Sequence, residues 1–339
     1  MPVNSILTGF GSPTWNLART ACEKDDTSLI AQALSAVSSQ DDLESLHRYS
    51  CRHAIDNNSA NVLTYLIEHG ANVQALLPMV VAGSGHTSKA ILEILLANGW
   101  DINWRDASCS DPNCEPFMWH VIDDYDMVAW CLEHGASVFP KDQEPLRDDT
   151  ITLSQRCCRQ ILERAAAKGT VATFELLRSE GAQLGWRPLH LAVENATLWP
   201  RDRGKEGADD EKQTGTESDH EKHEGTKSEN ARKYAERLAM IRHLIDVVGL
   251  DVNALDQPVG SRFGGRNGTP ICYIAAQYGL GTNTRELTWL LLDRGADPNP
   301  GLEMAKRVEH EGFEEDVEAW KAKHRSGTQS GASSQCNVQ

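Results

Sequence analysis

The residues whose types and spacing are best suited to chemistry are two cysteines and a histidine. Cys109 and Cys114 enclose the sequence Ser-Asp-Pro-Asn, and His120 follows them. Thiolate and imidazole are ligands that zinc prefers, but a structural zinc site takes four ligands. Cys131 or a histidine from elsewhere would have to complete the set. We therefore expect a plain loop punctuated by Asp-Pro-Asn, and keep an enzyme or zinc-dependent protein using these residues as the alternative.

Other candidate catalytic groups are better explained by structure. The chain contains no glycine-rich phosphate loop and no Gly-x-Ser-x-Gly elbow. We interpret the adjacent pair Cys157-Cys158 as packing residues. His69 and His134 each stand directly before a glycine at the end of an apolar run, where a cation suits a helix C-terminus. We expect no catalytic residue, no cofactor and no enzymatic activity.

Six glycines, each at the end of an aliphatic run, open a similar phrase along the chain. The phrases are GANVQ at Gly70, GWDIN at Gly99, GASVF at Gly135, GAQLG at Gly181, GLDVN at Gly249 and GADPN at Gly295. Glycine enters a left-handed backbone conformation without a Cβ penalty and therefore ends helices. Such an internal repeat decides architecture before any single motif does. We predict that each phrase stops a helix at the same structural place.

The residues before each glycine predict the helix that it ends. Val62, Leu63, Leu66 and Ile67 precede Gly70 with the spacing i, i+1, i+4, i+5, which forms one apolar stripe along a helix. A shorter, alanine-rich helix is expected further upstream in each unit, most clearly in residues 161–169 and 269–276. The predicted unit is a helix, a short turn, a second helix and a glycine.

These motifs resemble the ankyrin repeat, which opens with Thr-Pro-Leu-His-x-Ala and closes with Gly-Ala-Asp-x-Asn. Arg-Pro-Leu-His-Leu-Ala at 187–192 is similar to the opening, and Gly-Ala-Asp-Pro-Asn at 295–299 to the close. The resemblance implies an all-α fold, a solenoid of stacked helix-turn-helix units with projecting hairpin loops. It also implies that His190 forms a hydrogen bond within its turn.

We divide the chain into an N-terminal extension at 1–14, a repeat array at 15–323 and a tail at 324–339. Within the array the expected repeats are 15–46 (a degenerate first repeat), 47–73, 78–103, 116–139, 159–184, 187–253, 269–299 and 301–323 (a capping repeat with charged outer faces). The repeat at 187–253 is interrupted by an insertion at 200–233 that lacks leucine, isoleucine, valine and aromatic residues. Ordering such a segment costs about 1–2 kcal/mol per residue with little burial to offset it. We predict disorder there and in the tail.

Binding residues are expected in the loops that follow the helix ends. Tryptophan and arginine are enriched among binding hot spots, and loops on a rigid scaffold often carry function. The candidate partner-binding residues are Trp100, Trp104, Arg105, Asp106, Trp186, Arg187, Arg262 and Arg266. The alternative is that the aromatic residues shield the core beneath the loops.

Composition limits the class of partner and the compartment. The formal charge of -16 works against direct nucleic-acid binding and attracts a basic partner surface, although excess acid also aids solubility. No apolar stretch is long enough to span a membrane, and no signal peptide is evident. Nine cysteines without framework spacing favour a reducing compartment. The resemblance implies a monomeric protein-interaction scaffold, adaptor, regulator or transcription co-regulator in the cytoplasm, the nucleus or both.

Overall fold

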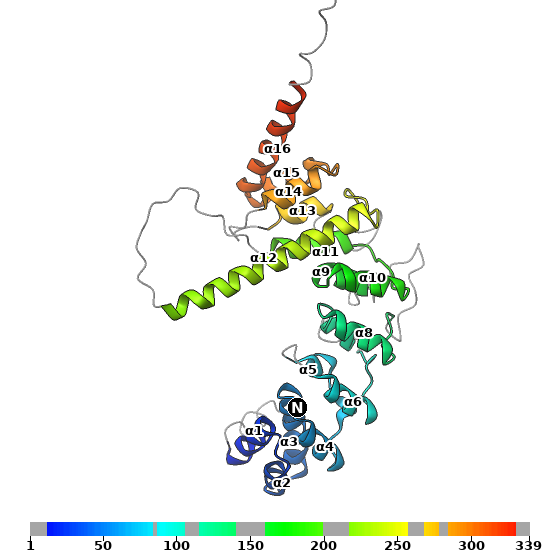
Figure 1. The fold of residues 1–339 in the computed structure, drawn as a ribbon, viewed down its shortest axis with the longest axis vertical. Coiled ribbons are helices and arrows are strands. Elements are labelled where there is room, and N and C mark those ends of the chain that lie inside the picture. Colours follow the sequence, from blue (N-terminus) through cyan, green and yellow to red (C-terminus); the bar gives the residue numbers. More distant parts are fainter. Residues whose placement is uncertain are drawn as a thin grey trace, which may run out of the picture. The chain divides into compact units, whose positions relative to one another are not determined.

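The computed structural model describes residues 12–83, 87–105, 115–139, 160–198, 217–256, 268–277 and 284–329, and within these ranges the side chains of all but 217–228 and 326–329. Throughout the described residues the regular structure is helical and no strand occurs, which confirms the all-α class. The chain divides into two compact units, Met1–Cys158 and Arg159–Gln339. Each unit consists of consecutive helix pairs (Figure 1).

In the first unit, helices alternate between two rows. The elements are α1 (Pro13–Lys24), α2 (Thr27–Ser35), α3 (Gln40–Asp56), α4 (Ala60–Glu68), the 3₁₀ turn η1 (Val73–Ala75), α5 (Pro78–Ala82), α6 (Lys89–Ala97), α7 (Phe117–His120) and α8 (Tyr125–Glu133). Helices α1, α3, α5 and α7 contact one another in that order, and α2, α4 and α6 do the same. Each pair therefore packs mainly on the pair before it and the pair after it.

The second unit has the same alternation. Its helices are α9 (Ile161–Lys168), α10 (Val171–Ser179), α11 (Pro188–Thr197), α12 (Glu217–Asp246), α13 (Pro270–Ala275), α14 (Arg285–Leu292), α15 (Pro298–Val308) and α16 (Glu311–Gln329). Helices α9, α11, α13 and α15 contact in sequence, while α10 contacts α12 and α14 contacts α16. The alanine-rich segments expected to be the first helices of their units correspond to α9 and α13.

The structure confirms how the closing glycines end their helices. All six have a left-handed backbone, with φ between +81° and +94°. After α4, the N–H of Ala71 donates to the carbonyl of Leu66, and after α6 the N–H of Trp100 donates to that of Leu95. These bonds run back five residues, as in the Schellman motif. After α12 the bond runs back six residues, from Leu250 to Leu244, because this helix end contains one extra residue.

The insertion expected to be disordered at 200–233 is helical from Glu217 onward, so that prediction was wrong for 217–233. Helix α12 runs well past its neighbour α11 (Figure 1). Ion pairs at i, i+4 support this stretch, Lys233 with Glu229 at 3.1 Å and Arg232 with Glu236 at 2.6 Å. Extending an existing helix also costs far less than nucleating one. The composition argument considered burial alone; residues 199–216 lie outside the described part.

Several other helix bounds differ from the expected ranges. Helix α3 begins at Gln40, inside the range 15–46 expected for the first repeat, because the Ser39 hydroxyl accepts a hydrogen bond from the N–H of Asp42 at 3.1 Å and caps the helix there. Helix α1 begins at Pro13, inside the expected N-terminal extension. Helix α16 continues to Gln329, inside the expected tail. Helix α15 begins at Pro298, inside the range 269–299 expected for the preceding repeat. The ranges 78–103, 116–139, 159–184 and 187–253 each contain two helices.

Asparagine side chains join neighbouring repeats at the loops. In the first unit, Asn103 donates from Nδ2 to the carbonyl of Gly135 at 2.8 Å, and its Oδ1 accepts from the N–H of Ser137 at 2.7 Å. Asn253 makes the same two bonds in the second unit, to the carbonyl of Gly295 at 3.0 Å and from the N–H of Asp297 at 2.8 Å. Each asparagine is the last residue of its glycine phrase and binds the next phrase.

A second set of ties lies at the turns between paired helices. Asp25, in the left-handed conformation after α1, accepts the N–H of Val62 at 2.9 Å in the first turn of α4. Asn58, also left-handed, accepts the N–H of Ser88 at 2.7 Å, just before α6. In the second unit the buried Arg237 of α12 donates to the carbonyl of Gly169 after α9. Repeats are thus held together by polar contacts on two edges as well as by the apolar core.

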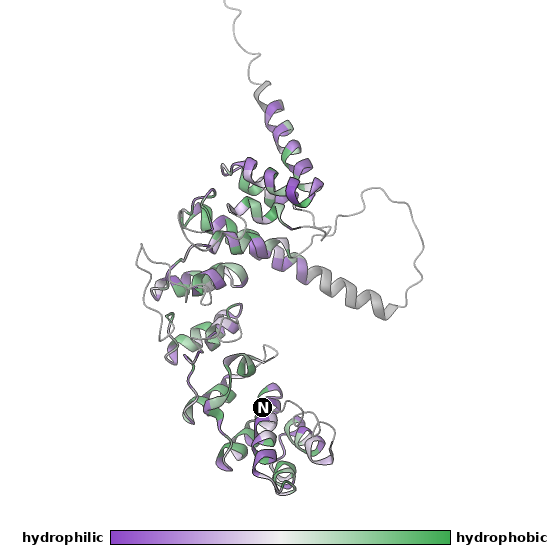
Figure 2. Ribbon diagram, turned by 180° about the vertical axis from the view of Figure 1, so that it is seen from behind, coloured by the Kyte–Doolittle hydropathy of each residue, from purple (hydrophilic) through white to green (hydrophobic). Residues whose placement is uncertain are grey.

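Helix α16 covers α14 at the end of the described array. Trp289 donates from Nε1 to the carbonyl of Asp316 at 2.9 Å, and Trp320 donates to Asp293 Oδ1 at 2.7 Å. The ammonium of Lys323 lies 4.8 Å from the centre of the Trp289 ring. Hydrophilic residues predominate on α16 (Figure 2), as expected for a capping element that leaves one face to water.

Candidate functional site

The loop between α10 and α11 is held in place by one buried carboxylate. Glu163 projects from α9 and is buried. Its Oε1 accepts the N–H of Trp186 at 3.0 Å and the N–H of Arg187 at 2.8 Å. The Arg187 guanidinium lies 3.9 Å from the other carboxylate oxygen. A buried carboxylate bonded to two backbone donors is well satisfied, so this contact fixes the loop backbone.

Gly185 makes this close approach possible. Its φ is +70°, and a Cβ added at this position would lie 2.7 Å from Oε1 of Glu163. Residues with a side chain rarely adopt that conformation, and none could do so here without moving the carboxylate. The loop geometry therefore requires a glycine directly before Trp186.

The indole of Trp186 stays exposed although its backbone is fixed. Its exposed fraction is 40%, whereas large apolar residues of the core are almost fully covered. On the next loop along the array, Leu255 has an exposed fraction of 49%. We call Trp186, Arg187 and Leu255 the loop surface. Because the backbone of Trp186 is already fixed, a partner that covers the indole need not order this backbone.

Buried polar contacts also fix the second loop. Nε2 of His190 lies 3.0 Å from the carbonyl of Ala254, so this nitrogen carries the proton of a neutral ring. Tyr273 donates to the buried Asp256 at 2.8 Å. Burial lowers the pKa of His190, and burial together with the Asp256 bond raises the pKa of Tyr273. His190 thus bonds the following loop, which corrects the expectation of a bond within its own turn.

Trp100 is a core residue, contrary to its selection as a contact residue. Its exposed fraction is 3%, Nε1 donates to the carbonyl of Leu76 at 3.0 Å, and its ring meets Phe117 edge-on at 5.6 Å. Trp104 and Arg105 are half-buried in the same loop. This loop of the first unit thus contributes to packing through its first tryptophan. The candidates Asp106, Arg262 and Arg266 lie outside the described residues.

The described residues offer no metal site. Cys109 and Cys114 lie outside them, as does the pair Cys157-Cys158. His120 is described, and its Nε2 lies 3.1 Å from the carbonyl of Glu115. Within the described ranges, no group of three or more histidine, cysteine, aspartate or glutamate residues could hold a metal ion.

The cysteines that the structure describes are free and buried. They are Cys22, Cys51, Cys131 and Cys272. Burial raises the pKa of Cys22, Cys51 and Cys131 to about 12, which leaves almost no thiolate at neutral pH. These side chains act as small core residues, as their positions on the helix stripes indicate.

The histidines before the closing glycines have a structural role. Nδ1 of His69 lies 2.7 Å from the carbonyl of Tyr65, and the two rings stack at 3.8 Å. His134 repeats this arrangement with Trp130, at 2.7 Å and 3.9 Å. Each ring satisfies a carbonyl in the last turn of its helix.

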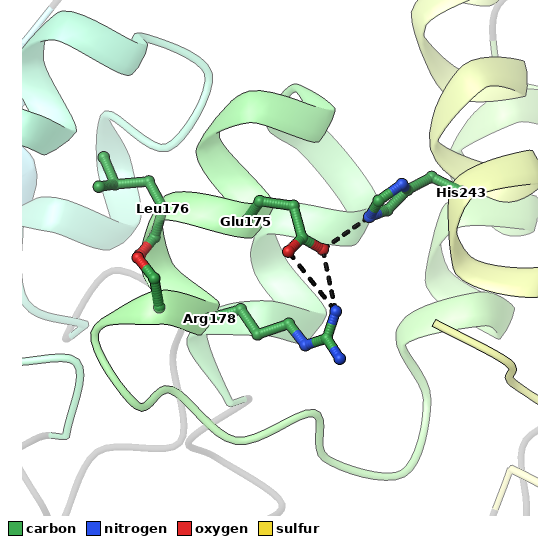
Figure 3. Close-up of polar contacts among 5 residues, drawn as sticks. Glu175, Leu176, Arg178 and His243 are labelled. Carbon is green, nitrogen blue, oxygen red and sulfur yellow. Dashed lines mark hydrogen bonds and ion pairs between the residues drawn. The ribbon is translucent and has the colours of Figure 1, made fainter. Parts of the chain in front are cut away.

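A polar cluster joins α10 to α12 in the second unit. Nε2 of His243 lies 2.6 Å from Oε1 of Glu175, and Arg178 donates to both oxygens of the same carboxylate, at 3.2 Å and 3.5 Å (Figure 3). Burial raises the pKa of Glu175, but the hydrogen bonds from His243 and Arg178 outweigh burial and hold that pKa below its usual value. The cluster ties two repeats and exposes no unpaired charge.

Sequence reasoning missed two residues of this site, Glu163 and Leu255. A signal for Glu163 was present, because a carboxylate in the otherwise apolar start of an alanine-rich helix needs a buried partner. Leu255 had no comparable signal, since one leucine after a loop asparagine is as often packed as exposed.

Within the described part of the chain, no helix combines the length and apolar character needed to cross a membrane. No protein-family model matches this chain, and no curated protein matches it either.

Proposed function

We propose that this protein is a non-catalytic binding module of the ankyrin-repeat type that holds another protein on its loop surface. The observation that carries the proposal is Trp186, an exposed indole on a backbone fixed by the buried Glu163. Pre-organised aromatic side chains are the residues from which binding hot spots are built. Leu255 on the neighbouring loop extends the apolar area.

Several features support the ankyrin-type solenoid in this proposal. The described helices form successive pairs that stack row on row within each unit. The closing glycines share one backbone conformation. Asn103 and Asn253, the last residues of their glycine phrases, each bind the next phrase. Arrays of this kind present loops on a rigid stack and serve as scaffolds, adaptors, regulators or transcription co-regulators. We expect a monomer in the cytoplasm or nucleus, because buried free thiols suit a reducing compartment.

The proposal is tested by capturing proteins from a cell extract with the full chain and comparing two variants. Trp186→Ala removes the exposed indole, and we expect it to abolish capture of a specific partner. Val247→Ala alters an even more exposed apolar residue, directly after α12, that is not part of the loop surface, and should leave capture unchanged. A partner retained equally by both variants would show that binding uses another surface.

A further inference from the structure

Arg187 has hydrogen-bonding capacity that its neighbours do not use. The side chain is 25% exposed, and its ionic contact with Glu163 spans 3.9 Å, which is too long for a hydrogen bond. Its guanidinium donates no hydrogen bond to any residue that the structure describes. A guanidinium carries five N–H donors in a planar fork that matches a carboxylate. The backbone of Arg187 is held by Glu163 at 2.8 Å, and its guanidinium can still bind an anionic partner.

Two buried carboxylates of this region, Glu163 and Asp256, already accept hydrogen bonds from other groups. Glu163 binds two backbone N–H groups. Asp256 accepts the Tyr273 hydroxyl at 2.8 Å and the N–H of Gly268 at 3.3 Å. Neither carboxylate hydrogen-bonds the guanidinium. The cation of Arg187 therefore belongs to a loop surface that also carries two exposed apolar side chains, Trp186 and Leu255.

We infer that the loop surface recognises a peptide segment in which an apolar side chain lies beside a carboxylate. This inference rests on the proposed function and specifies the partner's chemistry. The indole and Leu255 would cover the apolar side chain, and Arg187 would bind the carboxylate. Trp186 and Arg187 are consecutive residues whose backbone N–H groups bind the same carboxylate, so the backbones that carry the apolar and cationic side chains are fixed relative to each other.

The net charge of the chain favours a basic partner over an acidic one, but only at long range. The formal charge of -16 would attract basic surfaces. At physiological ionic strength, however, charges in solvent are screened over about 8 Å. Once two surfaces touch, the nearest groups decide the interaction, and here the nearest group with unused donors is a cation. Net charge should therefore slow the association with an acidic segment without preventing it.

The test is selection of a random peptide library, displayed on phage, against the purified full chain at physiological salt. We expect the recovered peptides to combine an aromatic or aliphatic residue with a neighbouring aspartate or glutamate. A synthetic peptide of the recovered sequence and its Asp→Asn or Glu→Gln form are then titrated against the wild-type chain, Trp186→Ala, Arg187→Gln and Val247→Ala. Circular dichroism and thermal unfolding establish that each variant is folded.

A double-mutant cycle isolates the contact between Arg187 and the peptide carboxylate. In the wild-type chain, neutralising the peptide carboxylate should weaken binding about tenfold, as loss of a charge-assisted hydrogen bond does. In Arg187→Gln the same change should have almost no further effect. Trp186→Ala should weaken binding about thirtyfold or more, and Val247→Ala should leave it unchanged.

Three results would overturn this inference: recovery of basic or uncharged peptides, recovery of no peptide, or a carboxylate effect that persists in Arg187→Gln. The proposed function would still stand if protein capture continued to depend on Trp186. Loss of that dependence would instead count against the proposed function itself. The two experiments therefore distinguish failure of the partner's chemistry from failure of the binding surface.

Discussion

At the scale of single residues, the molecule depends on a few close approaches that substitution can test. Gly185 and Gly181 lie in the same loop and both have positive φ, +70° and +87°. Only Gly185 faces a side chain, since a Cβ there would meet Glu163, whereas nothing lies within 4 Å of a Cβ at Gly181. Comparing alanine substitutions at these two glycines therefore separates the cost of backbone strain from the cost of a steric clash.

We expect Gly181→Ala to lower the free energy of unfolding by about 1–2 kcal/mol, the cost of a left-handed alanine. Gly185→Ala should cost at least about 1 kcal/mol more, because it also displaces a buried carboxylate from its two backbone donors. Urea unfolding of the two variants checks the difference. Equal losses would mean that Glu163 moves aside freely and does not hold the loop.

His190 should make stability depend on pH in the mildly acidic range. Burial lowers its pKa in the folded state below the usual value of 6.5, so the unfolded chain binds the proton more readily. The contribution of neutral His190 to the free energy of unfolding is complete above pH 6.5 and is lost as the pH falls below 6.5. His47 and His53 shift in the same direction because of burial.

The contribution of His190 can be measured by comparing wild type with His190→Gln. We expect the free energy of unfolding of the wild type to fall between pH 7.5 and pH 5.5, and the variant to fall by a smaller amount. Only the difference between the two pH values is compared, so a general destabilisation of the variant does not affect the result. An identical fall in both proteins would show that other groups cause the pH dependence.

At the scale of elements, Asn103 and Asn253 each join their own glycine phrase to the next one. Asn253 spans from its own phrase to Gly295 and Asp297 through a donor and an acceptor. Asn195, by contrast, bonds only the carbonyl of Leu191 within its own helix. We expect Asn253→Ala to lower the free energy of unfolding by about 1–3 kcal/mol and Asn195→Ala to have little effect. Chemical denaturation of both variants tests whether contacts between repeats outweigh those within a helix.

Helix ends were more predictable than helix starts. A closing glycine acts through its own backbone, so Gly70 and its five counterparts could be recognised without knowledge of the fold. The start of α12 has no such local marker. Helical structure propagates toward Glu217 from the packed C-terminal half of the same helix, and i, i+4 ion pairs add support between residues 229 and 236. Composition alone therefore predicted the wrong state for residues 217–233.

At the scale of the whole molecule, helix α16 covers α14 and α15 at the end of the second unit. Phe313 and Val317 of α16 are fully buried, and a Cβ added to Gly301 of α15 would lie 2.8 Å from the Phe313 ring. Removing α16 would uncover apolar surface on α14 and α15. Uncapped arrays expose their core in this way and aggregate.

Truncation after Glu309 should therefore lower the unfolding temperature and promote aggregation, as measured by circular dichroism and light scattering. The control is Glu318→Ala with Lys321→Ala in the full chain, which removes an ion pair of α16 between an exposed glutamate and a half-buried lysine. We expect this control to match the wild type. If the truncated chain unfolds at the wild-type temperature, α16 is not a structural cap.

The sequence by itself determined the all-α class, the helix pairs and the points where helices end, because periodicity and glycine conformation act over a few residues. Only the tertiary structure decided which tryptophan is exposed. Trp100 directly follows the closing glycine Gly99, and Trp186 lies in the loop after the closing glycine Gly181. Trp100 bonds the Leu76 carbonyl and packs on Phe117, whereas Glu163 fixes the backbone of Trp186, whose ring stays exposed. Exposure depends on residues distant in the chain, and local patterns do not contain that information.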